Sequence, residues 1–297
     1  MATEKNKKYE LTDETQVLAD GRVLHRIRAV MDFTLSNGDS VHAGELGGWV
    51  EKEDNLSHEG TAWVRGSARV FGSARVSGSA LIYGSAVVSG SARVYEDARV
   101  GDDARVGDEA LVYTNALVSD HAKVSGNAKV YGNAEVYDKA RVYDKACVYG
   151  YSTVFESARI YGDARVCGSS EVYGSASVCG YAAVYGNARI YGDARVFGNA
   201  DVYGEAIVCG DAHVKGPYDY AVFKNTWSSG RFFTFTRSNK MWAVGCFRGT
   251  GDELIAKAYK DSELSGRCYE AIVRAQEAIE KATDYGKQIS DTAEGMA

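Results

Sequence analysis

Apolar side chains recur at every sixth position through the middle of the chain. Valine or isoleucine occupies 26 such positions, from Val64 to Val214, without one change of register. Alanine stands two residues before nearly all of them, and serine replaces it only at Ser152 and Ser170. A fixed short period of this kind is typical of a repeat architecture, in which each copy packs only on its neighbours.

Each hexad reads as one short strand followed by a turn. In residues 188–193, small apolar, polar, branched apolar and large side chains alternate, which is the pattern of a half-buried strand with a period of two. Gly192 and Asp193 then supply turn residues. Because a four-residue strand cannot bury its apolar face alone but stacked copies can, the spacing predicts an all-β solenoid over residues 62–217.

The repeat resembles the hexapeptide-repeat family of left-handed parallel β-helices. The resemblance implies a left-handed winding in which three hexads form one triangular coil, so that residues eighteen apart are neighbours on one of three flat sheets. The alanines would then lie where the interior narrows near a corner. We expect that leucine at Ala128 would overpack the interior and cost about 1–3 kcal/mol.

A second resemblance concerns the segment that leads into the repeat. Residues 46–50, 55–57 and 62–64 look like the leader of uncharacterised hexapeptide-repeat proteins from phages, prophages and bacteria. That group has no firmly assigned activity, so the resemblance suggests a source and not a reaction.

The regions on either side of the repeat have a different pattern. Residues 1–61 are predicted to form an N-terminal β cap, with hairpin strands at 15–18 and 22–30 joined by an Asp-Gly turn. Because open coil ends expose unpaired backbone groups, we expect Trp49 and Trp63 to cover the first coil.

Residues 218–297 are predicted to form a small α+β domain. The expected elements are strands at 220–224, 231–236 and 241–247, a helix that begins after Thr250, and a second helix over 262–285. Such a domain would cap the solenoid, bind a partner or join subunits.

Composition excludes several classes of function. A net charge of −6 does not indicate a nucleic-acid binder, and no apolar run reaches membrane-spanning length. Residues 1–8 are mostly polar and rich in lysine, unlike a signal peptide. The six cysteines form no CxxC pair and no Cys/His metal spacing. We therefore expect a cytoplasmic protein without metal or cofactor, with reduced thiols.

The outward positions carry the functional information. When these positions are sorted by eighteens, one column holds four consecutive cations, Arg105, Lys123, Arg141 and Arg159. Tyr143 and Tyr161 stand in the adjacent column. These six residues are the predicted ligand-binding site, in which the cations hold an anion while the tyrosine rings stack on a flat group.

Two other interpretations of this column remain open. In one, the surface is simply solvated and the arginine stems lie over the tyrosine rings. In the other, corner acids neutralise the cations; the candidates are Asp102, Asp103, Asp138 and Asp144. The third face, with Leu81, Leu117 and Ile207, is the predicted subunit contact of a homo-oligomer, most simply a trimer by analogy with the family.

An enzyme is the main alternative to a binding protein. Many left-handed β-helix proteins are acyltransferases that use a histidine as general base between subunits; the candidates here are His25, His42, His58, His121 and His213. Such enzymes commonly carry a loop extruded from a coil, and the 26 hexads contain none. We therefore predict a non-enzymatic β-solenoid with no catalytic residue, a phage or prophage accessory protein that binds a host protein or an anionic nucleotide-type ligand in the host cytoplasm. A hexapeptide-class acyltransferase and a self-assembling structural rod are the alternatives.

Overall fold

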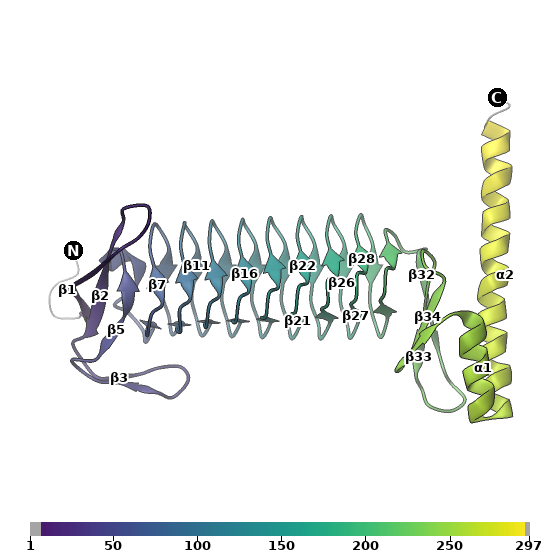
Figure 1. The fold of residues 1–297 in the computed structure, drawn as a ribbon, viewed down its shortest axis with the longest axis horizontal. Coiled ribbons are helices and arrows are strands. Elements are labelled where there is room, and N and C mark those ends of the chain that lie inside the picture. Colours follow the sequence, from purple (N-terminus) through teal and green to yellow (C-terminus); the bar gives the residue numbers. More distant parts are fainter. Residues whose placement is uncertain (1–6, 295–297) are drawn as a thin grey trace. The chain divides into compact units, whose positions relative to one another are not determined.

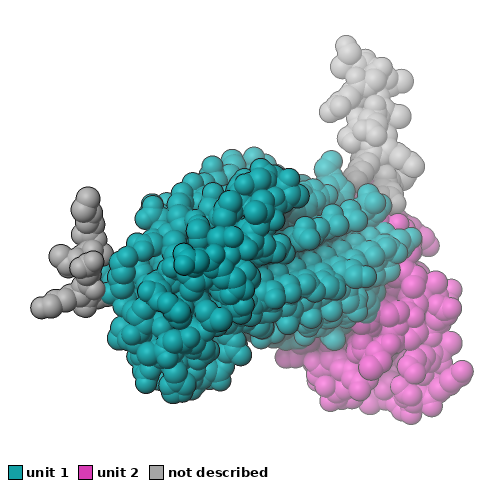
Figure 2. Space-filling model, turned by 60° about the vertical axis from the view of Figure 1, so that its left-hand side comes forward, with its two compact units in different colours: residues 1–217 teal, residues 218–297 magenta. Residues whose placement is uncertain are grey.

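A computed structural model describes residues 7–294 of the chain, with side chains described as far as residue 283. The chain divides into two compact units, residues 1–217 and residues 218–297 (Figure 2). Each unit is built around its own core.

The first unit is a parallel β-solenoid of about nine turns (Figure 1). Its 26 two-residue strands, β6 (Trp63–Val64) to β31 (His213–Val214), lie at the 26 predicted hexads. Each strand from β6 to β28 pairs in parallel with the strand eighteen residues further on, as Val88 pairs with Val106. The predicted β-solenoid with three hexads per coil is therefore confirmed.

Three parallel sheets form the faces of the solenoid. One face carries the predicted cations Arg105, Lys123, Arg141 and Arg159 and is called the basic face. It contains β7 (Arg69–Val70), β10 (Val87–Val88), β13 (Arg105–Val106), β16 (Lys123–Val124), β19 (Arg141–Val142), β22 (Arg159–Ile160), β25 (Ser177–Val178), β28 (Arg195–Val196) and β31. The second face contains β8 (Arg75–Val76), β11 (Arg93–Val94), β14 (Leu111–Val112), β17 (Lys129–Val130), β20 (Cys147–Val148), β23 (Arg165–Val166), β26 (Ala183–Val184) and β29 (Asp201–Val202). The third face contains β6, β9 (Leu81–Ile82), β12 (Arg99–Val100), β15 (Leu117–Val118), β18 (Glu135–Val136), β21 (Thr153–Val154), β24 (Glu171–Val172), β27 (Arg189–Ile190) and β30 (Ile207–Val208).

The interior of the solenoid is lined by the branched residues and the alanines of the hexads. The branched residues are at most 1% exposed, and the alanines are fully buried. Ser152 and Ser170 are tolerated at alanine positions because each hydroxyl donates a hydrogen bond to a backbone carbonyl, that of Tyr149 at 2.9 Å and that of Cys167 at 2.8 Å. The small position therefore accepts a polar atom only where the backbone satisfies it.

The corners between strands require a left-handed backbone. Glycine supplies it at most corners, for example Gly132 with φ 73°. Acidic residues take its place at several others, including Asp102, Asp120, Asp138 and Asp144, with φ between 54° and 59°. The carboxylate of Asp138 accepts a hydrogen bond from the corner N–H of Glu156 in the next coil at 3.1 Å. These acids are therefore part of the corner structure.

The N-terminal region extends the sheet of the basic face. β1 (Tyr9–Val17) and β2 (Val23–Ala29) form an antiparallel hairpin, which confirms the predicted hairpin, although its first strand begins at Tyr9 and not at Thr15. β2 pairs antiparallel with β5 (Leu46–Val50), and β5 pairs in parallel with β7. Two short strands, β3 (Phe33–Thr34) and β4 (Ser40–Val41), and a 3-10 helix, η2 (Glu53–Asn55), complete this region.

The first coil begins earlier than predicted. Val50 pairs with Val70 and Leu56 bridges to Val76, so residues 50–64 already form a coil on which the repeat stacks. These partners are twenty residues apart and not eighteen, because two extra residues separate Leu56 from Val64. The insertion hides this coil from a search for period six.

The two tryptophans of this region differ in role. Trp63, expected to cover the first coil, is itself fully buried and packs against the N-terminal region, with the Phe33 ring edge-on at 5.3 Å between ring centroids. The prediction for Trp49 is wrong, because this side chain stands partly exposed on the outer surface with the Arg26 guanidinium over it at 5.6 Å. The hairpin residues Leu24 and Ile27, both fully buried, provide apolar cover that Trp49 does not.

The second unit is an antiparallel sheet with two helices. It contains β32 (Tyr220–Lys224), β33 (Phe232–Thr236), β34 (Met241–Val244), β35 (Phe247–Gly249), α1 (Gly251–Asp261) and α2 (Glu263–Glu294). The predicted single strand over 241–247 is wrong, because Gly245 adopts φ 55° and the chain reverses there into β35. The core of this unit includes Phe233, Trp242 and Val273.

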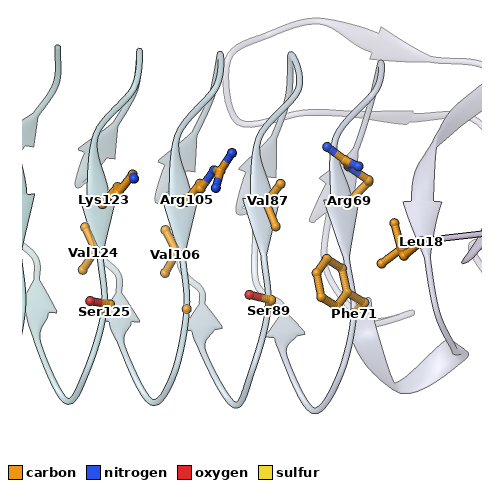
Figure 3. A pocket seen from close by; sticks show the side chains of 11 residues that line it. Leu18, Arg69, Phe71, Val87, Ser89, Arg105, Val106, Lys123, Val124 and Ser125 are labelled. Atoms are coloured by element: carbon orange, nitrogen blue, oxygen red, sulfur yellow. The ribbon is translucent and has the colours of Figure 1, made fainter. Parts of the chain in front are cut away.

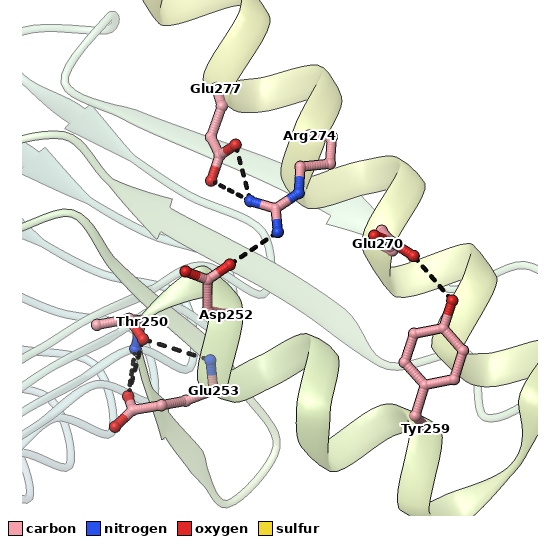
Figure 4. A network of polar contacts seen from close by, with 7 residues as sticks. All are labelled: Thr250, Asp252, Glu253, Tyr259, Glu270, Arg274 and Glu277. Carbon is pink, nitrogen blue, oxygen red and sulfur yellow. Dashed lines mark hydrogen bonds and ion pairs between the residues drawn. The ribbon is translucent and has the colours of Figure 1, made fainter.

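Polar contacts fix the start of α1 and join it to α2 (Figure 4). Thr250 caps α1: the Glu253 N–H donates to its hydroxyl, and the Thr250 N–H donates back to the Glu253 carboxylate at 2.8 Å. Arg274 of α2 donates to Asp252 at 2.8 Å. The helix start predicted at Thr250 is thereby confirmed.

Candidate anion-binding face

The four predicted cations stand in register on consecutive strands of the basic face. Arg105 pairs with Lys123, Lys123 with Arg141, and Arg141 with Arg159. Their side chains are exposed, while the following residue of each strand is buried in the interior. Neighbouring rungs are about 4.8 Å apart, so four positive charges follow one another along this face.

The column has no ion-pair partner among the described residues. Within the described residues, none of the four cations forms an ion pair with an acidic side chain. The corner acids proposed to neutralise the column have other partners. Asp102, Asp138 and Asp144 accept backbone N–H groups of the next coil, and Asp103 lies 3.5 Å from His121. In the described chain these corner acids therefore form no direct ion pair with the column.

Tyr143 and Tyr161 form one stacked pair. Their ring centroids are 5.0 Å apart and their planes are within 1° of parallel. The pKa of Tyr161 is raised to about 12, mainly by a hydrogen bond with the Cys179 thiol and secondly by burial. Burial also raises the pKa of Tyr143. Since the rings cover each other, only the outer face of each is open to a ligand.

The column of Tyr143 and Tyr161 is interrupted by small residues, which leaves two grooves on the basic face. The N-terminal groove, of about 430 Å³, is shown in Figure 3. Its residues include Leu18, Arg69, Phe71, Ser89, Arg105, Gly107, Lys123 and Ser125. The C-terminal groove, of about 370 Å³, is lined by Arg159, Tyr161, Ser177, Cys179, Arg195, Phe197 and His213.

The grooves divide the predicted site. Arg105 and Lys123 line the N-terminal groove, and Arg159 and Tyr161 line the C-terminal groove. Arg141 and Tyr143 line neither groove, so they stand on the ridge between the two. The six predicted residues thus contribute to two hollows and the ridge that separates them.

The N-terminal groove also contains residues outside the six predicted ones. Arg69 lies in the same column as the cations, separated from Arg105 by Val87, and within the described chain its buried Nε atom has no hydrogen-bond partner. Leu18 reaches the groove from the turn of the β1–β2 hairpin and lies beside Phe71 (Figure 3). Arg22, which pairs with Asp20 at 3.1 Å, places its guanidinium 5.1 Å from the centre of the Phe71 ring. The positions of Arg69 and Phe71 could have been predicted from the spacing of the repeat, whereas those of Leu18 and Arg22, outside the repeat, could not.

The candidate histidines have local partners. His25 Nδ1 lies 3.3 Å from the carbonyl oxygen of Thr12, His42 lies 3.6 Å from Asp32, and His58 stacks on Tyr9 at 4.4 Å. Burial lowers the pKa of His58. His121 is an exposed corner residue, and His213 lies in the C-terminal groove.

Two further features of the described chain bear on function. No helix in residues 7–294 combines the length and the apolar character needed to cross a membrane. The same residues contain no group of three histidine, cysteine or acidic side chains placed to hold a metal ion. All six cysteines are free thiols.

Comparison with known proteins gives one family match, which lies within the repeat. Residues 158–174 and 188–204 match the family model of the YdcK β-solenoid repeat. No curated protein matches the chain. Together with the nine-turn parallel solenoid, the match supports a repeat β-helix family.

Proposed function

We propose that this β-solenoid repeat protein is a non-enzymatic binding protein whose basic face binds an anionic ligand or an acidic partner. The observation that carries the proposal is the in-register column of Arg105, Lys123, Arg141 and Arg159, which has no carboxylate partner within the described chain. The resemblance of residues 46–64 to phage and prophage proteins adds the finer proposal of an accessory protein acting in the host cytoplasm.

The charge arrangement has an energetic consequence. Four like charges about 4.8 Å apart repel one another, even when water screens them. A bound anion would remove this repulsion and accept charge-assisted hydrogen bonds from the guanidinium groups. Arg141 and Arg159 are the pair to test, because they lie on adjacent strands beside the stacked tyrosines.

The test reverses the charge of this pair. We expect the Arg141→Glu/Arg159→Glu variant to bind a fluorescein-labelled polyglutamate peptide at least tenfold more weakly than the wild type in fluorescence anisotropy. Binding by the wild type should weaken as salt is added, because exposed charges are screened. Arg93→Glu/Arg165→Glu is the matched control, since it makes the same change of charge on the second face. Equal binding by the two double variants, or no binding by the wild type at low salt, contradicts the proposal.

The partner of the third face stays a separate prediction. Leu81 and Ile207 are only 3% and 4% exposed, so of the three residues expected at a subunit contact only Leu117 offers an apolar side chain to a second copy. Sedimentation measures the oligomer directly against the monomer mass of 32.1 kDa. Turnover of acetyl-CoA, if found, would favour the acyltransferase alternative.

A further inference from the structure

The N-terminal groove depends on a glycine that the backbone does not require. Gly107 occupies a position that elsewhere in its column holds Phe71, Tyr143, Tyr161 or Phe197. Its φ is outside the left-handed region, and an added Cβ would meet only the Ser89 hydroxyl, at 3.5 Å. Glycine weakens a strand relative to alanine. Neither backbone geometry nor close packing therefore explains why this position lacks a side chain.

The third face provides a direct comparison. Gly101 occupies the equivalent position there, one rung from Tyr83. A Cβ on Gly101 would lie 1.9 Å from the Cζ atom of Tyr83, so the tyrosine ring already fills that space. The gap on the third face is closed by the protein itself, whereas the gap at Gly107 remains open.

The open gap is long enough to admit a planar ring and the groups attached to it. Small residues occupy three consecutive rungs, Ser89, Gly107 and Ser125, between the aromatic rings of Phe71 and Tyr143. With rungs about 4.8 Å apart, these two rings are four rungs, or roughly 19 Å, from each other. The groove volume of about 430 Å³ falls in the range of small-ligand sites. A planar ring at the rung of Ser89 would stack on Phe71, as Tyr161 stacks on Tyr143 at 5.0 Å, and would lie one rung from Gly107.

Cations lie along one side of the open gap. Figure 3 shows Arg69, Val87, Arg105 and Lys123 in one row and Phe71, Ser89 and Ser125 in the row beneath, so Val87 separates Arg69 from the two other cations. Among the described residues, the buried Nε of Arg69 has no hydrogen-bond partner, and Arg105 and Lys123 have no carboxylate partner. Guanidinium groups suit phosphate oxygens in both charge and geometry. A ligand that places a ring in the lower row would therefore place an attached anion among these cations.

We infer that the N-terminal groove binds a nucleotide-type ligand, with its flat heteroaromatic ring in the gap at Gly107 and its phosphate held by Arg69, Arg105 and Lys123. The hydroxyls of Ser89 and Ser125 are available to hydrogen-bond the ring or the sugar. This inference rests on the proposed function of the basic face, and it specifies the class of ligand and the part of the face that binds it.

Calorimetric titration of the full-length protein tests the ligand class. We expect AMP or GMP to bind, and adenosine and ribose 5-phosphate each to bind at least tenfold more weakly, because each lacks one of the two groups that the groove recognises. Equal affinity for ribose 5-phosphate and the nucleotides overturns the role of the ring. Absence of nucleotide binding overturns the inference altogether.

The Gly107→Tyr variant tests the location. It fills the gap with a ring and leaves every cation in place, so we expect nucleotide affinity to fall at least tenfold while the fold and binding of the polyglutamate peptide persist. Gly107→Ala should retain nucleotide binding, because its Cβ makes only an ordinary contact. Cys167→Tyr is the matched control, since it adds a ring between Tyr149 and Tyr185 on the second face.

The outcomes separate the two proposals. Nucleotide binding that is unchanged in Gly107→Tyr overturns binding in the open gap, whatever the polyglutamate peptide does. Polyglutamate binding that depends on Arg141 and Arg159, without any nucleotide binding, leaves the proposed function standing and removes this inference. A Gly107→Tyr protein that fails to fold is distinguished by circular dichroism. In that case Arg105→Gln/Lys123→Gln, which keeps the open gap, must weaken nucleotide binding.

Discussion

At the scale of single residues, the corners show how one backbone requirement is met by two chemistries. Glycine reaches positive φ without strain, whereas an acidic residue at the same place accepts some strain and contributes an acceptor. Asp102, Asp120, Asp138 and Glu156 form such a series, in which each carboxylate accepts the corner N–H of the next coil. This explains why acidic residues occur at corners where glycine would suffice.

The Asp138→Ala variant tests this corner series. Alanine tolerates φ of 56° poorly and cannot accept the Glu156 N–H, so the free energy of unfolding should fall by about 1–2 kcal/mol. Asp138→Asn should be close to the wild type, because asparagine tolerates this backbone region and keeps a side-chain acceptor. Urea unfolding followed by circular dichroism measures the difference. If alanine and asparagine behave alike, the hydrogen bond between coils contributes nothing.

At the scale of elements, the N-terminal cap depends on one buried tyrosine. Tyr9 of β1 is fully buried, and its hydroxyl lies 2.9 Å from the carbonyl oxygen of Glu53 and 2.8 Å from that of Leu56. It therefore joins the hairpin to the irregular first coil. Burial, together with Glu53 and Asp54, raises the pKa of Tyr9, so the hydroxyl remains a donor.

We expect Tyr9→Phe to destabilise the solenoid by about 1–3 kcal/mol, because it removes the hydroxyl proton that is shared between the buried Leu56 carbonyl and the part-buried Glu53 carbonyl. Thermal unfolding in the same buffer measures the loss. Tyr181→Phe serves as the control, since Tyr181 is 72% exposed and should lose nothing measurable. Equal midpoints for the two variants would show that water replaces the Tyr9 hydroxyl.

The tyrosine ladder of the second face predicts a loss of stability in alkali. Tyr95, Tyr113, Tyr131 and Tyr149 stack with ring centroids 4.8–4.9 Å apart. Burial, and then the neighbouring tyrosines, raise the pKa of Tyr113 from 10.0 to about 12. The folded protein therefore holds this proton more tightly than the unfolded chain. The contribution of protonated Tyr113 to the free energy of unfolding is complete below pH 10 and is lost as the pH rises from 10 to about 12.

The measurement is the unfolding midpoint as a function of pH. In the wild type it should fall across this alkaline window, and Tyr113→Phe should make the fall less steep because phenylalanine has no proton to lose. The absorbance of tyrosinate reports the titration independently. A Tyr113→Phe protein that loses stability as steeply as the wild type would assign the effect to other groups.

Element prediction from the sequence succeeded where one pattern determined the structure. The valine and isoleucine of each hexad must face inward, so period six gave every strand from β6 to β31. It failed at Leu56, where two extra residues before Val64 break the period, although the backbone still pairs with the repeat. It also failed at Gly245, since a single glycine inside an apolar run does not reveal whether the chain bends or reverses.

At the scale of the whole molecule, the solenoid turns a sequence period into a surface. The column of cations was predictable because residues eighteen apart are neighbours, as the pairing of Arg105 with Lys123 shows. The grooves were not predicted, because a hollow depends on whether a nearby ring leans into it. Tyr83 fills the space at Gly101, whereas no ring fills the space at Gly107. Leu18 could not be placed from spacing either, since it comes from the hairpin outside the repeat.

The two units should unfold as separate transitions. The solenoid is stabilised coil by coil through its valines, whereas residues 218–297 have a separate aromatic core around Phe233 and Trp242. We expect calorimetry of the full-length protein to show two heat-absorption peaks. Val130→Ala removes apolar volume from the solenoid interior and Val273→Ala removes it from the second core; both side chains are fully buried.

Each of these variants should move one peak to a lower temperature and leave the other in place. The affected unit should lose about 2 kcal/mol of its free energy of unfolding. The two variants serve as each other's control, because they make the same chemical change at equally buried positions in different cores. A single peak, or a shift of both peaks by either variant, would show that the units fold as one cooperative body. The second unit would then contribute to the stability of the solenoid that carries the basic face, and variants of the second unit should be tested for ligand binding as well.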